Sequence, residues 1–139
     1  KDVDLEKWCI TGGMKPEAGK HRTVPIHTRI RDLVKRNYDE AVSLGSDRLF
    51  NDPEAAKGGM RITYDKYAGR FNKVVAALHL RSEHRPHDPR TTFITMAKKA
   101  GVDEYVVKRL AGHKITDVTE AVYTIRDIEW LRAEIEKMP

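Results

Sequence analysis

The chain reads DEYVVKRLAGH over residues 103–113. Asp103 is a residue type that caps helices, and the apolar residues after it recur at helical spacing, which predicts a helix with one buried face. Its inward positions are Val106, Val107 and Leu110. Gly112 can adopt the left-handed conformation that ends many helices. The stretch therefore predicts a short helix that stops at Gly112 and is followed directly by His113.

Apolar residues at helical spacing predict further helices on both sides of this stretch. Upstream, one helix runs from Ile30 to Val42 and stops at Gly45, a second is capped by Thr63, and a third starts near Arg90 and ends at Gly101. Downstream, a short helix holds Val118 to Tyr123, and the last begins near Asp127. The expected inward residues are Ile30, Leu33, Val34, Ala41 and Val42; Tyr64, Tyr67, Ala68, Phe71, Val74, Val75 and Leu78; Phe93, Met96, Ala97 and Ala100; and Ile128, Leu131 and Ile135.

The N-terminal residues predict a β-hairpin. Residues 6–14 and 21–26 each contain a short apolar alternation, and the turn-rich stretch Lys15–Lys20 separates them. Residues 46–60 are expected to form a loop with a short strand at Arg48–Phe50, and residues 81–89 a second loop. The fold class is therefore α+β and mainly helical, with a small N-terminal antiparallel sheet on a helical bundle in a single domain, residues 1–139.

Composition narrows the class of protein. The 139 residues are 40% hydrophobic, enough for a real core, and their formal charge is +5 with a pI of about 9.4, which favours a polyanionic partner. Cys9 is the single cysteine, so no internal disulfide can form and a reducing compartment is expected. The longest apolar run, Val74 to Leu78, is far too short to span a membrane. With no signal-peptide pattern at the start, the sequence is interpreted as cytoplasmic.

Four short motifs carry residue types that can act on a phosphate. Lys15 lies on the predicted hairpin, His87 and Arg90 stand in the motif His-Asp-Pro-Arg, His113 follows Gly112, and Tyr123 precedes a threonine. Taken singly, each motif is more often structural than functional. A metal site formed by His79, His84, His87 and Asp88 is not favoured, because no cysteine or second ligand cluster accompanies it.

In this order and at this spacing the motifs resemble the tyrosine recombinase, or phage integrase, family. The resemblance covers essentially the whole chain. It is carried by Asp2-Val3-Asp4-Leu5-Glu6, Gly19-Lys20-His21-Arg22-Thr23-Val24-Pro25-Ile26, His87-Asp88-Pro89-Arg90-Thr91-Thr92-Phe93, Leu110-Ala111-Gly112-His113 and Thr119-Glu120-Ala121-Val122-Tyr123-Thr124. It implies the family's catalytic-domain fold and site-specific recombination or integration of double-stranded DNA, through a covalent 3′-phosphotyrosyl intermediate and without a cofactor or metal.

The resemblance also implies residue roles. Tyr123 would be the nucleophile, and Arg90, His87 and His113 would hold the scissile phosphate. One histidine, with His87 preferred to His113, would accept the phenol proton. Lys15 would protonate the leaving oxygen, with Lys20 as its competitor, although both could be solvated lysines that contact phosphates. The expected DNA contacts are Lys20, Arg22 and Lys114.

The sequence departs from the family pattern in three places. Pro89 stands where the family usually has Leu, and Thr91 where it often has His; both changes are expected to affect only the local backbone. By the resemblance, the family's first catalytic arginine would precede the Asp-Val-Asp stretch, so neither it nor the N-terminal DNA-binding domain is expected within these 139 residues. The 139 residues alone are therefore expected to be inactive, unless Arg22 or Arg109 replaces the missing arginine.

Three functional alternatives follow. The first is the recombinase, the second is a type IB topoisomerase-like enzyme that relaxes DNA, and the third is a non-catalytic DNA-binding relic of the fold.

As in the family, the intact enzyme is expected to act as a homotetramer on DNA. Residues 125–139 are the candidate for docking onto a neighbouring subunit, and Trp130, which falls off the apolar stripe, is expected at the surface or at such a contact.

Overall fold

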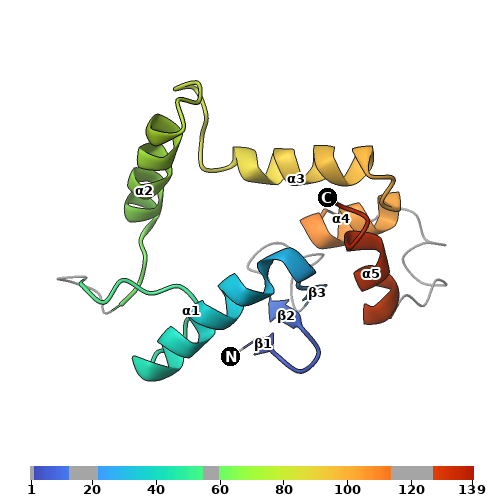
Figure 1. Cartoon of the computed structure of the whole chain (residues 1–139), viewed down its shortest axis with the longest axis horizontal. Coiled ribbons are helices and arrows are strands. Elements are labelled where there is room, and N and C mark those ends of the chain that lie inside the picture. Colours follow the sequence, from blue (N-terminus) through green and yellow to red (C-terminus); the bar gives the residue numbers. More distant parts are fainter. Residues whose placement is uncertain (1, 13–21, 55–59, 114–126) are drawn as a thin grey trace. The chain divides into compact units, whose positions relative to one another are not determined.

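The computed structural model describes residues 2–12, 22–54, 60–113 and 127–139 (Figure 1). The chain divides into two compact units, one of residues 36–92 and the other of residues 2–35 and 93–139. Within the described residues, five α-helices and a three-stranded antiparallel sheet are present, which confirms a mixed fold with a small N-terminal sheet. That residues 1–139 act as one domain stays a prediction.

The sheet belongs to the unit of residues 2–35 and 93–139. Its strands β1 (Val3–Asp4), β2 (Cys9–Gly12) and β3 (Arg22–Pro25) lie in the order β1-β2-β3. Ile10 pairs with Val24 and Gly12 with Arg22, which confirms the two strands of the predicted hairpin. Strand β1 was not predicted, because two residues are too few to show an alternation.

The same unit contains the core. Helix α4 (Glu104–Ala111) begins as predicted, because the Asp103 carboxylate accepts hydrogen bonds from the amides of Tyr105 and Val106 at 2.9 and 3.2 Å. Helix α5 (Ile128–Ile135) is capped in the same way by Asp127. The buried cluster consists of Ala97, Val102, Val106, Val107, Leu110, Leu131 and Ile135. Helix α4 thus has the inward face that its spacing predicted.

Helix α5 and the residues after it make hydrogen bonds to other parts of their own unit. The Glu134 carboxylate accepts hydrogen bonds from the Asp103 amide at 2.8 Å and from Lys137 Nζ at 2.7 Å. Burial alone would raise the pKa of Glu134, but these two donors lower it below its usual value. Arg132 donates to the carbonyl oxygens of Trp8 and Lys7. In this structure the described part of the predicted docking segment, residues 127–139, therefore packs within its own unit.

Trp130 is half-buried and packs against the core cluster. The surface alternative of the prediction is therefore only partly right, and a contact with a neighbouring subunit stays a prediction. The indole lies beside the apolar stripe of α5 and is large enough to reach the cluster from its edge.

The apolar face predicted for the first helix is only partly buried. Helix α1 (Arg31–Ser43) follows a single 3-10 turn, Thr28–Ile30, and buries Val34 and Ala41. The other expected inward residues, Ile30, Leu33 and Val42, are exposed.

Helix α2 (Tyr64–Ala77) begins at its predicted cap, since the Thr63 hydroxyl accepts a hydrogen bond from the Lys66 amide at 3.4 Å. Of its predicted inward face only Val75 is buried. Tyr64, Tyr67, Val74 and Leu78 are exposed, and the prediction that Tyr64 and Tyr67 belong to the core was wrong. Helical spacing determines which residues share a face, but it does not determine whether another element covers that face.

Two predicted boundaries need correction. No strand forms at residues 48–50, because side chains there satisfy the backbone locally: Ser46 Oγ accepts from the Arg48 amide, and Asn51 Nδ2 donates to the Arg48 carbonyl oxygen. A single antiparallel bridge joins Asn51 and Arg61 instead. Helix α3 (Asp88–Lys99) begins two residues before the predicted start, with Pro89 as its second residue. Proline is tolerated in a first helical turn because its missing amide would have no partner there.

None of the helices in the described part of the chain is both long and apolar enough to cross a membrane.

Burial predicts how two leucine substitutions should differ. Leu131 is 2% exposed in the core cluster, whereas Leu78 is 63% exposed. We expect Leu131→Ala to lower the free energy of unfolding by about 2–5 kcal/mol, because it leaves a cavity. Leu78→Ala should change it by less than about 0.5 kcal/mol. Chemical denaturation followed by circular dichroism measures both, and equal losses would contradict the assigned core.

Candidate functional site

Four of the eight predicted site residues fall within the described part of the chain. His87 and Arg90 belong to the unit of residues 36–92, and Arg22 and His113 belong to the other unit. The other four, Lys15, Lys20, Lys114 and Tyr123, lie outside the described residues.

His87 directly precedes α3, and Arg90 lies in its first turn. The Arg90 amide donates to the His87 carbonyl oxygen at 3.1 Å, and the Asp88 amide donates to the Arg85 carbonyl oxygen at 2.9 Å. These bonds place a histidine and an arginine one turn apart, with His87 exposed and Arg90 half-buried. A helix start carries partial positive charge, so the arginine and the helix end both favour an anion there.

Asp88 fastens the loop before α3 to the helix. Its Oδ2 accepts a hydrogen bond from the Arg85 amide at 3.1 Å and lies 3.1 Å from Nδ1 of His84. The Arg85 amide first, and His84 second, hold the pKa of Asp88 below its usual value. His84 thus pairs with a carboxylate, and in the described residues no group of three His, Cys, Asp or Glu side chains is arranged to hold a metal ion.

His113 follows the C-terminal end of α4. Gly112 has φ 70° and ψ 36°, its amide donates to the Arg109 carbonyl oxygen at 3.0 Å, and the His113 amide donates to the Lys108 carbonyl oxygen at 2.8 Å. These two bonds form the common glycine-terminated helix end. The predicted stop at Gly112 is confirmed, and the backbone of His113 is fixed while its side chain is exposed.

Arg22, the first residue of β3, reaches this helix end. A Cβ atom added to Gly112 would lie 2.9 Å from Cζ of Arg22 and 3.5 Å from its Nη2, and Nη1 would be closer still. The guanidinium group therefore occupies the space that a side chain at position 112 would need. Its Nε is buried and has no hydrogen-bond partner among the described residues. The sequence indicated a DNA contact for Arg22, but nothing in the sequence linked it to Gly112.

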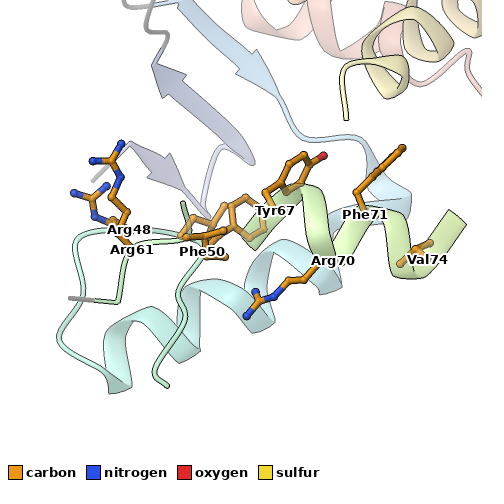
Figure 2. A pocket seen from close by; sticks show the side chains of 9 residues that line it. Arg48, Phe50, Arg61, Tyr67, Arg70, Phe71 and Val74 are labelled. Carbon is orange, nitrogen blue, oxygen red and sulfur yellow. The ribbon is translucent and has the colours of Figure 1, made fainter. Parts of the chain in front are cut away.

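The structure also contains a pocket that the sequence did not predict. It lies in the unit of residues 36–92, and the view in Figure 2 shows Phe50 and Tyr67 side by side with Arg48 and Arg61 next to them. Its lining residues are Arg48, Leu49, Phe50, Arg61, Ile62, Tyr67, Arg70, Phe71 and Val74. The apolar stripe of α2 was the signal in the sequence, but it was interpreted as core. Arg70 is partly neutralised by Asp52, whose Oδ1 is 3.3 Å from Nη2.

The model of the phage integrase family matches residues 1–129, which is nearly all of the chain. The chain belongs to the phage integrase family. Members are tyrosine recombinases, which act on DNA in integration and site-specific recombination. Comparisons with curated proteins and with solved structures returned no significant match. The family membership confirms the resemblance that the motifs indicated.

The pairing of Asp88 predicts a pH dependence. A lowered carboxyl pKa stabilises the fold above the ordinary value of about 3.9, and that stabilisation is lost as the pH falls through the lowered pKa. We expect Asp88→Asn to be less stable than the parent at neutral pH and equally stable once Asp88 itself is protonated. Urea denaturation at several pH values measures this difference. The exposed Glu83→Gln serves as control, and a difference for Asp88→Asn that persists in acid would refute the assignment.

Proposed function

We propose that this chain contains part of the catalytic domain of a tyrosine-type site-specific recombinase, which cuts and rejoins DNA through a covalent 3′-phosphotyrosyl intermediate at Tyr123. The single observation that supports it best is the family match over residues 1–129. That range includes Lys15, Arg90, His113 and Tyr123, in the order that the sequence analysis identified.

The scissile phosphate is bound by Arg90, His87 and His113. In-line attack adds negative charge to the non-bridging oxygens, and fixed donors that meet this charge lower the barrier. A planar guanidinium can donate two hydrogen bonds to one phosphate, which suits Arg90. The described geometry supports these roles because each side chain is attached to a fixed helix end: His87 and Arg90 at the start of α3, His113 after α4.

The Tyr123 hydroxyl attacks the phosphorus atom. A free phenol has a pKa of about 10, so the proton must pass to a base as the bond forms. His87 is the preferred base and His113 the alternative. The new P–O bond to Tyr123 replaces the P–O bond to the 5′-oxygen. Because the ester linkage is retained, rejoining requires no ATP.

The leaving 5′-oxygen takes a proton from Lys15, with Lys20 as the competing donor. Both residues lie outside the described part of the chain. Lys20, Arg22 and Lys114 contact the DNA backbone, and the net charge of +5 supports a polyanionic partner. The intact enzyme acts as a homotetramer on two duplexes, as the resemblance implies.

Tyr123→Phe tests the nucleophile. The change removes one hydroxyl group, so in the full-length protein it should abolish the SDS-resistant DNA adduct and leave the Kd for duplex DNA within about twofold. Incubation with a nicked suicide substrate, followed by denaturing electrophoresis, measures the adduct. Tyr105→Phe, which changes a tyrosine on α4, is the matched control and should keep the adduct. An adduct in the Tyr123→Phe variant would show that another group attacks.

Lys15→Ala tests the general acid. It should slow cleavage of ordinary DNA strongly, by about 10² or more, because the 5′-oxygen is then a poor leaving group. A 5′-bridging phosphorothiolate substrate leaves without a proton and should restore the rate. Lys20→Ala, tested in parallel, should show no such rescue. An equal defect of Lys15→Ala on both substrates would assign Lys15 to DNA positioning instead.

The same assays distinguish the recombinase from the two alternative functions. Relaxation of supercoiled DNA without exchange of partners would indicate a topoisomerase-like enzyme. Binding without any adduct would indicate a non-catalytic relic.

A further inference from the structure

We propose that Arg22 is a positioning residue: its guanidinium packs on Gly112 and fixes the helix end from which the His113 side chain projects. The inference rests on the proposed function in one respect, that His113 contacts the scissile phosphate. In this proposal Arg22 positions His113, in addition to making the DNA contact that the sequence indicated.

Three glycines of the described chain have a left-handed backbone, and only one of them is contacted in this way. Gly45, Gly101 and Gly112 have φ of 62°, 72° and 70°. A Cβ atom would meet nothing within 4 Å at Gly45 or Gly101, but at Gly112 it would collide with the Arg22 guanidinium. Glycine is therefore required at position 112 for two reasons, the backbone conformation and the approach of Arg22, whereas positions 45 and 101 have only the first.

Strand pairing holds Arg22 in place. Arg22 pairs with Gly12 at the end of β3, and Oγ1 of the next residue, Thr23, lies 3.0 Å from Oγ1 of Thr11 on β2. The Arg22 backbone is thus part of the sheet, while its side chain extends to the end of α4. Because Nε makes no hydrogen bond within the described part of the chain, packing and charge hold the guanidinium there rather than a bond from Nε.

The charge of Arg22 suits this position. The C-terminal end of a helix carries partial negative charge from its last carbonyl groups, and a cation there is stabilising. Arg22 meets α4 at its C-cap residue, Gly112. The same helix end fixes the His113 amide through its bond to the Lys108 carbonyl oxygen. Removing the guanidinium would leave Gly112 free to sample other conformations and would loosen the backbone of His113.

Hydrogen exchange tests the contact without any DNA. In Arg22→Ala, the amides of Gly112 and His113 should exchange about 5- to 30-fold faster, because a partly buried charge at a helix end contributes about 1–2 kcal/mol. The Gly101 amide, which donates to the Lys98 carbonyl oxygen at a similar helix end, is the internal control and should not change. Equal acceleration at all three amides, or none, would overturn the proposal.

A pair of alanine variants gives a second test if Arg22→Ala folds poorly. Gly112→Ala and Gly101→Ala impose the same left-handed strain, but only the first displaces Arg22. Gly112→Ala should accelerate exchange of the His113 amide, whereas Gly101→Ala should leave that amide unchanged. Equal acceleration of exchange at the His113 amide in both variants would show that Arg22 does not position His113.

Single-turnover cleavage at saturating DNA in the full-length protein separates positioning from DNA contact. Arg22→Ala should slow cleavage by up to about 10²-fold, the cost of a small misplacement, in the parent but not in a His113→Ala background. Equal slowing in both backgrounds would mean that Arg22 acts on DNA directly and would overturn the proposal. If the parent itself formed no adduct, the proposed function would fail, while the exchange result would still decide the contact between Arg22 and Gly112.

Discussion

The packing of α4 against β3 and α5 is the constraint on which the described position of His113 depends. Val106, Val107 and Leu110 are buried in one cluster with Leu131 and Ile135 of α5. Because this face is fully covered, the helix end at Gly112 has a defined position, and so has the backbone of His113. The buried carboxylate of Glu134 joins the same two helices through the Asp103 amide. The packing of this core thus determines the backbone position of His113, which is one of the predicted phosphate ligands.

Helix ends hold all three predicted phosphate ligands that the structure describes. Arg90 and His87 stand at the start of α3, where the loop is fastened by Asp88, and His113 stands after the left-handed residue that ends α4. Both ends are fixed by local hydrogen bonds, so the backbone from which each side chain projects has a defined local geometry. Such local fixation suits the proposed phosphoryl transfer step, because its catalysis rests on positioning and charge.

The sequence predicted local structure well and burial less well. Capping residues such as Asp103 and Thr63 act on their own backbone, so their helix starts could be identified from nearby residues alone. The predicted burial of Tyr67 required elements distant in the sequence to cover this side chain. That prediction was wrong, because Tyr67 is exposed. The candidate site residues were predicted from the order of their motifs in the sequence. The match to the family model confirmed the family, whereas the role of each residue is a proposal. The contact of Arg22 with Gly112 joins residues 90 positions apart in the chain, and no local pattern could have revealed it.

Identification of the residue that becomes joined to DNA decides whether Tyr123 is the nucleophile. The covalent complex formed on a suicide substrate would be digested with protease and nuclease, and the modified peptide sequenced by mass spectrometry. We expect a 3′-phosphate ester on the phenol oxygen of Tyr123. An ester on another residue, such as Tyr105, or a link to the 5′ end of the cut strand, would contradict it.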